Sequence, residues 1–230
     1  LQVQTDWTDG ENSIKEMTEA AKKQGLEYLV ITDHTKSLAM ANGSDEKRLL
    51  KQMAEIDEVQ KQISGIKILK GAEVNINKDG TLDINDETLA KLDVVGASVH
   101  SNFSMPEADM TKRIIRAMEN PNVDILFHPT GRLIQKREPY KVNMGKIIKT
   151  AKHTRTVLEI NAWPERLDLK DEYIRKAVDA GVKLAIDSDA HSAGHFKFLE
   201  FGIAQARRGW CEKKDVINTK SWQEMLSLLK

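Results

Sequence analysis

The sequence predicts an α/β fold, a closed barrel in which parallel strands alternate with helices. Seven short runs of apolar and β-branched residues recur along the 230 residues, each followed by polar or turn residues. The centres of these runs are nearly all apolar, which is typical of a parallel sheet covered by helices. No Gly-rich phosphate motif follows the first run, so a dinucleotide-binding fold is disfavoured. The expected strands are 1–4, 27–34, 66–74, 92–100, 123–129, 156–162 and 182–191.

Five segments between these strands have the period of an amphipathic helix. The first, 13–25, begins with a Ser…Glu capping box and ends at Gly25. In the second, 44–64, apolar residues recur near positions i, i+3, i+4 and i+7. The chain has no internal repeat and no linker, so a single domain is expected. The remaining helices are expected at 107–120, 144–154 and 171–181.

The composition disfavours several classes of protein. Basic and acidic residues balance at 35 each, which argues against a strongly basic nucleic-acid surface but allows a local patch. Cys211 is the only cysteine, so no disulfide framework or Cys-based zinc motif is expected. No apolar run approaches the ~18 to 20 residues of a membrane span, and no signal peptide is visible, so a cytoplasmic location is expected. Because Leu1 already lies in an expected strand, we interpret the chain as a piece of a longer protein.

Histidine and carboxylate residues stand where the expected strands end. In β/α barrels the C-terminal ends of the strands meet at one rim and carry the chemistry. A single histidine there is more simply explained as a hydrogen-bonded loop residue, but histidines at four strand ends predict a cluster. Imidazole and carboxylate suit zinc, manganese or iron, so the cluster is expected to bind metal. Its candidate members are His34, Glu73, His100, His128, Asp187, Asp189 and His191.

Other candidate residues are compatible with more than one role. Arg132 follows His128 closely and could either clamp a phosphate or pair with a neighbouring carboxylate. His195 lies four residues after His191 and could support the same rim. The four tryptophans are more typical of core or rim packing than of platforms for stacking bases.

The strand-end motifs also resemble a known family. TDH, GAEV, SVH, HP and DSDAH, in this order and spacing, resemble the PHP (polymerase and histidinol phosphatase) domain over essentially the whole chain. The stretches HPTGRLIQKREPY, LEINAWPERLDL and GIAQARRGWCEKKDVINT resemble the C-terminal PHP domain of bacterial and archaeal family X DNA polymerases. This resemblance implies a distorted (β/α)7 TIM-like barrel over residues 1–230, excised from a chain with an N-terminal polymerase region. It also implies a trinuclear metal site that hydrolyses phosphodiesters, typically a manganese-dependent 3′→5′ exonuclease acting on DNA 3′ ends in repair.

One motif departs from the family pattern. Where relatives carry His-x-His at the end of the first strand, this chain has Gln2-Val3-Gln4. An amide oxygen is a poor ligand for zinc and a tolerable one for harder cations, so the metal served by this motif should be weak or absent. The resemblance therefore implies two or three Mn²⁺ or Zn²⁺ ions. The ligands that it implies are Asp9, His34, Glu73, His100, His128, Asp189 and His191.

By resemblance, these ligands divide among three metals. Glu73 and Asp189 serve the metal of the first motif, and Glu73 also joins His100 and His128 at a second. The third metal is implied at Asp9, His34 and His191.

Three functions follow from these expectations. The first is hydrolysis of DNA phosphodiesters at 3′ ends, weakened by the loss of the two histidines. The second is a catalytically degenerate module that binds metal and supports the polymerase. The third is a phosphomonoesterase similar to histidinol phosphatase. For hydrolysis, the expected catalytic residues are His34, His100, Asp189, His191 and Arg132, with His195 behind them.

Overall fold

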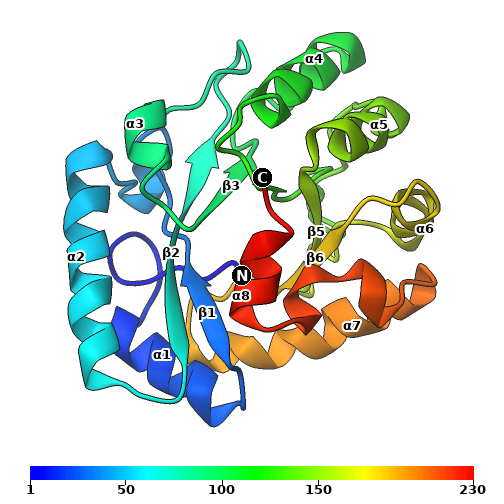
Figure 1. Ribbon diagram of the computed structural model, residues 1–230. Coiled ribbons are helices and arrows are strands. Elements are labelled where there is room, and N and C mark those ends of the chain that lie inside the picture. The colour runs from blue at the N-terminus through cyan, green and yellow to red at the C-terminus, as the bar shows by residue number, and fades with distance from the viewer.

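A computed structural model describes residues 1–230, and its centre is a curved sheet of six parallel strands (Figure 1). Each strand pairs with the next one in chain order, so the sheet curls into a half-barrel. The longest pairing joins Gly71 to Val94 and continues to Asn75 and Ser98. The strands are β1 (Tyr28–Ile31), β2 (Lys67–Asn75), β3 (Val94–Ser98), β4 (Ile125–Leu126), β5 (Val157–Asn161) and β6 (Leu184–Asp187).

Helices follow the strands and cover the outside of the sheet, as the alternation predicts. The first helix has the expected capping box, in which Ser13 N donates to the Glu16 carboxylate at 2.8 Å. The five expected helices are α1 (Ile14–Lys23), α2 (Glu46–Gln62), α4 (Glu107–Met118), α5 (Met144–Thr154) and α6 (Asp171–Asp179). Three further helices are α3 (Asp86–Leu89), α7 (Leu199–Arg208) and α8 (Trp222–Ser227). The 3₁₀ turns are η1 (Ala39–Ala41), η2 (Ala193–Phe198), η3 (Lys213–Asp215) and η4 (Ile217–Thr219).

The expected strand at 1–4 is reduced to a single bridge, between Val3 and Ala190. Val3 O accepts from Thr32 N at 2.8 Å, and Gln4 N donates to Ala190 O at 2.9 Å. The pairing stops there because the chain turns at once, with Thr8 N donating back to Thr5 O at 3.0 Å. Residues 1–4 therefore join the C-terminal ends of β1 and β6 but leave the two strands otherwise unpaired.

The inside of the half-barrel is filled by one apolar side chain from each strand. Phe127 adds its ring at the centre, and Gly96 on β3 makes room for it, since a Cβ there would lie 1.8 Å from the ring. Met225 of α8 and the following Leu229 also belong to this cluster, and Figure 1 shows α8 within the curve of the sheet. The strand residues are Val30, Leu69, Val94, Ile125, Val157 and Ala185.

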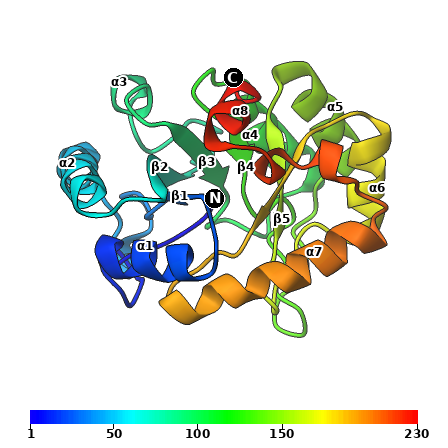
Figure 2. The ribbon, with the colours of Figure 1, turned by 60° about the horizontal axis from the view of Figure 1, so that its bottom comes forward.

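Two larger apolar clusters join the sheet to the surrounding helices, whose arrangement around the sheet Figure 2 shows. One joins α1 and α2 to β1 and β2, and the other joins α4, α5 and α6 to the strands from β2 to β6. These layers hold the strands in place, so that the rim where they end is presented by a rigid scaffold. None of the helices has the length and apolar character that a membrane span requires.

Candidate metal centre

Seven side chains with ligand atoms gather at the rim where the strands end. Glu73 lies on β2 itself, and His34, His100 and His128 follow β1, β3 and β4. The others lie in loops after residues 1–4 and after β6. This is the end at which β/α barrels carry their chemistry. The loop residues are Asp9, Asp189 and His191.

Glu73 is the centre of this group and is fully buried. Its Oε1 atom lies 3.1 Å from both His100 Nε2 and His128 Nε2. Its Oε2 atom lies 3.5 Å from His34 Nδ1. One carboxylate therefore faces three imidazoles that come from three different strand ends.

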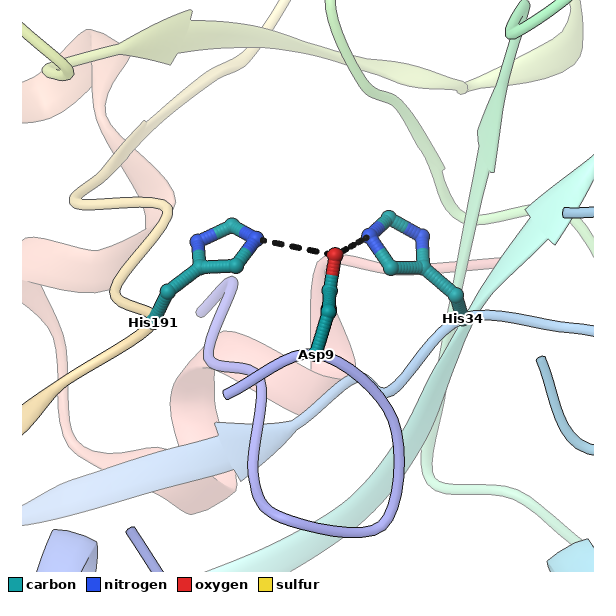
Figure 3. A group of neighbouring side chains, drawn as sticks. All are labelled: Asp9, His34 and His191. Atoms are coloured by element: carbon teal, nitrogen blue, oxygen red, sulfur yellow. Dashed lines mark ion pairs between the residues drawn. The ribbon is translucent and has the colours of Figure 1, made fainter. Parts of the chain in front are cut away.

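A second group lies farther out on the rim, where Asp9 stands between two histidines (Figure 3). Asp9 Oδ2 is 3.5 Å from His34 Nε2 and 3.7 Å from His191 Nε2. His34 thus turns one ring nitrogen toward Asp9 and the other toward Glu73. This shared ring links the outer group to the inner one.

Asp189 completes a third group with His128 and Glu73. Its Oδ2 atom is 3.9 Å from His128 Nε2, and Arg166 Nε approaches the same oxygen at 3.3 Å. In each of the three groups the ligand atoms lie within 4.8 Å of one another. The groups are Asp9–His34–His191, His34–Glu73–His100 and Glu73–His128–Asp189.

The donor set fits divalent cations, and several of its buried atoms lack another partner. Glu73 Oε1, His34 Nδ1 and Gln4 Oε1 are buried without a hydrogen bond. Unpaired buried polar atoms are costly, so a cluster of them needs a compensating partner. Nitrogen and carboxylate oxygen atoms together suit zinc, manganese or iron.

The backbone is also unusual at two of these residues. His128 has φ of 46° and Asp189 has φ of 53°, both in the left-handed region. Residues other than glycine adopt this region at a cost, and such residues concentrate at functional sites. The fold therefore holds both side chains in place against their local preference.

Comparison with known proteins agrees with this geometry. The model of the PHP domain family matches residues 1–208. The chain belongs to the PHP domain family. It is 44% identical over its whole length to a Bacillus subtilis protein named DNA polymerase/3′-5′ exonuclease PolX. The chain spans 40% of the length of that relative, and the resemblance to the PHP domain of family X polymerases is confirmed.

Free-standing relatives and solved structures lie in the same family. A protein of Thermoanaerobacter sp. named probable phosphatase is 34% identical over 218 residues, which are 90% of this chain and 84% of that protein. A crystal structure of histidinol phosphate phosphatase from Lactococcus lactis, complexed with zinc, L-histidinol and phosphate, has a TM-score of 0.65 at 14% identity. It covers 92% of this chain and 93% of its own, so it confirms the fold.

Gln2 and Gln4, the departure from the PHP pattern, point into the inner group and are fully buried. Their Nε2 atoms donate to Glu73 Oε2 at 2.8 and 3.0 Å. Gln2 Nε2 also lies 3.2 Å from His128 Nε2. Two neutral N–H groups therefore donate to Glu73 Oε2, at the position where the first family motif has two histidines.

The charged side chains around Glu73 keep this central carboxylate of the metal centre ionised. Burial raises the pKa of Glu73, but the charges of His34, His128 and His100 outweigh it and hold the pKa well below its usual range. Burial also raises the pKa of Asp189, and His128, His191 and Arg166 lower it below its usual value. Buried carboxylates that remain charged provide a field that attracts cations.

A set of polar residues behind the cluster holds the ligand-bearing segments. The buried Asp33 carboxylate accepts hydrogen bonds from Thr5 N at 2.8 Å, Thr5 Oγ1 at 2.6 Å and Gln52 Nε2 at 2.6 Å. Thr8 Oγ1 donates to it as well. Asp33 thereby fixes the loop that carries Asp9.

Two of the ligand-competent histidines have partners of their own behind the cluster. Asn75 Oδ1 lies 2.7 Å from His100 Nδ1, and Asn161 Nδ2 lies 3.2 Å from His128 Nδ1. Glu159 Oε2 accepts from His128 N at 2.8 Å. Such partners set the orientation of ligand imidazoles in metal sites.

Arg132, Asp187 and His195 lie outside the three groups. Arg132 Nε donates to Arg166 O at 2.7 Å, and its Nη2 donates to Leu167 O. In this structure Arg132 therefore holds the loop of Arg166, and its contact with phosphate stays a prediction. His195 Nδ1 accepts from His191 N at 3.2 Å, and Asp187 is buried at the end of β6.

Sequence reasoning overlooked Arg166 and the residues that support the histidines. Asn75 and Asn161 end their strands just as the candidate histidines follow theirs, so the same positional rule would have selected them. Asp33 precedes His34 directly and carries the same signal. Arg166 has no such signal, because it reaches Asp189 from within a loop.

Proposed function

We propose that this PHP domain hydrolyses phosphodiesters in a metal-dependent reaction and removes nucleotides from DNA 3′ ends. The observation that carries this proposal is Glu73, a buried carboxylate with three imidazoles within 3.5 Å. The Bacillus subtilis relative, named as a 3′-5′ exonuclease, supports the choice of DNA as substrate. The full-length protein would then combine this domain with a polymerase region.

The residues of the site would have three roles: binding cations, contacting phosphate and orienting the ligand imidazoles. Asp9, His34, Glu73, His100, His128, Asp189 and His191 would hold the cations. Divalent cations at such a site neutralise phosphate charge and lower the pKa of water. Arg166, half-buried beside Asp189, would contact a phosphate oxygen. Asn75, Asn161 and Glu159 would keep the imidazoles oriented during the reaction.

A degenerate metal-binding module is the second candidate, and the glutamines favour it. Gln2 and Gln4 place two N–H donors on Glu73 Oε2, where the family pattern has two histidines. A phosphomonoesterase is the third, supported by relatives named probable phosphatase. The retained ligand groups and the left-handed His128 and Asp189 weigh against the degenerate reading.

The test measures metal content and the hydrolysis of two substrates in parallel. The purified chain is incubated with Mn²⁺, freed of excess metal and examined by elemental analysis. Release of nucleotides from a 5′-labelled oligonucleotide supports the exonuclease, and hydrolysis of histidinol phosphate alone supports the phosphomonoesterase. Bound metal without any hydrolysis supports the structural module. Glu73→Gln is the matched control and should abolish whichever activity is found.

A further inference from the structure

A row of aromatic rings extends from the metal centre across the rim. Trp163 stands edge-on to His191 with ring centroids 5.6 Å apart, and edge-on to His195 at 4.7 Å. Phe198 stacks on His195 at 5.0 Å, with an interplanar angle of 16°. Phe201 follows Phe198 at 6.2 Å. The row therefore begins at a candidate ligand and continues outward without a break.

These rings come from three segments, and core packing does not explain them. Trp163 follows β5, His195 and Phe198 belong to η2, and Phe201 lies in the first turn of α7. Trp163 and Phe198 are only partly buried, yet neither packs against any of the three apolar clusters of the core. Phe201 is 40% exposed. Trp163 therefore packs against rings of the rim and not in the core, which is one of the two roles expected from the sequence.

One cation lies over a ring of the row, and a second pairs with a candidate ligand of the metal centre. Lys197 Nζ lies 5.8 Å from the centre of the Phe198 ring and is exposed. At the metal centre, Arg166 Nε lies 3.3 Å from Asp189 Oδ2, two residues before His191. Aromatic faces combined with nearby basic side chains are the pattern by which proteins bind single-stranded nucleic acid. A small phosphomonoester bound at the metal centre has no second aromatic group to place on the outer rings.

We infer that this row is a stacking platform for the nucleobases next to the phosphate at the metal centre. The inference rests on the proposed function, because it takes a single-stranded DNA end as the occupant. The rings would bind bases with little regard to sequence, since every base offers a π face. Lys197 and Arg166 would lie near the backbone phosphates.

Binding of a 5′-fluorescein oligothymidylate, followed by anisotropy without added metal, tests the platform separately from hydrolysis. Phe198→Ala and Phe201→Ala should each weaken binding by roughly 5- to 100-fold, the loss typical of one stacked base. Ile203→Ala is the matched control, since Ile203 is 44% exposed on the same helix but outside the row. That variant should bind like the parent.

The outcomes separate the platform from the proposed function. Weakened binding in both phenylalanine variants, with no hydrolysis in the parent, supports the platform and overturns the exonuclease. Hydrolysis in the parent, with unchanged binding in both variants, overturns the platform alone. A parent that binds no oligothymidylate also overturns the platform. Circular dichroism of Phe198→Ala and Phe201→Ala checks that both variants fold.

Discussion

Gln2 Nε2 lies 2.8 Å from Glu73 Oε2, deep in the rim of the half-barrel. Gln4 Nε2 donates to the same oxygen at 3.0 Å. The two amides stand on one face of the 1–4 segment, as residues two apart on an extended chain do. Both amides donate a hydrogen bond to Glu73 Oε2, which would otherwise be free to bind a cation. The two glutamines thus give this oxygen of Glu73 hydrogen-bond partners at the position where the family pattern has two histidines.

Restoring histidine at both positions should restore a metal position. In the double variant Gln2→His, Gln4→His, imidazole nitrogens replace amide donors beside Glu73, and Val3 between them stays packed at 2% exposure. We expect one additional metal ion per chain, measured by elemental analysis after incubation with Mn²⁺. Cleavage of 3′ ends should also become faster.

The double variant discriminates between the proposed functions. An added metal without faster cleavage would favour the structural module, because the defect would lie elsewhere. No added metal would show that the rim has closed around these side chains. Gln60→His serves as the control, since Gln60 lies on α2 away from the rim and should leave metal content unchanged.

His128→Ala should lower metal content more than Gln4→Ala. The imidazole of His128 is 3.1 Å from Glu73 and 3.9 Å from Asp189, and imidazole is the stronger ligand. Elemental analysis of the two variants side by side measures the difference. Equal losses would indicate that Glu73 binds cations without His128.

Asp33→Ala should destabilise the chain by about 3 kcal/mol or more. The substitution leaves four donors from Thr5, Thr8 and Gln52 without an acceptor in a buried site. Urea unfolding followed by circular dichroism measures the change. Asp57→Ala is the matched control, because Asp57 pairs with Lys70 at the surface and should cost less than about 1 kcal/mol.

Gly96→Ala should destabilise the barrel interior by roughly 1 to 3 kcal/mol. The new methyl group would lie 1.8 Å from the Phe127 ring, which must then move within a filled cluster. Gly145→Ala in α5 meets only Asn143 Oδ1 at 3.4 Å and should stabilise the chain by about 0.5 to 1 kcal/mol. Opposite signs in thermal unfolding support this account, and a loss in both variants contradicts it.

The sequence predicted the alternation of strands and helices because both leave a strong periodic signal. It missed α7, whose exposed Phe201 and Ile203 blur the polar face expected of an amphipathic helix. It also predicted a full strand at residues 1–4, where the structure has only the bridge between Val3 and Ala190. Whether they pair depends on Thr32 and Ala190, which are distant in sequence.

The rim residues could be predicted from the sequence because the strands of a β/α barrel all end at the same rim. His34, Glu73, His100 and His128 lie at such ends, and the structure brings them within contact distance. Arg166 and the aromatic row could not be predicted from the sequence, because their positions depend on how loops fold over the rim. Arg132 was selected from its closeness to His128 in sequence, whereas its hydrogen bonds go to Arg166 and Leu167.

The most direct test of the account is release of nucleotides from the 3′ end of a single-stranded oligonucleotide, measured with and without Mn²⁺. The account predicts release that requires Mn²⁺, stops on chelation and is lost in Glu73→Gln, because Glu73 joins the inner groups of ligands. A chain that binds metal, as elemental analysis can show, yet releases no nucleotide under any of these conditions would contradict it.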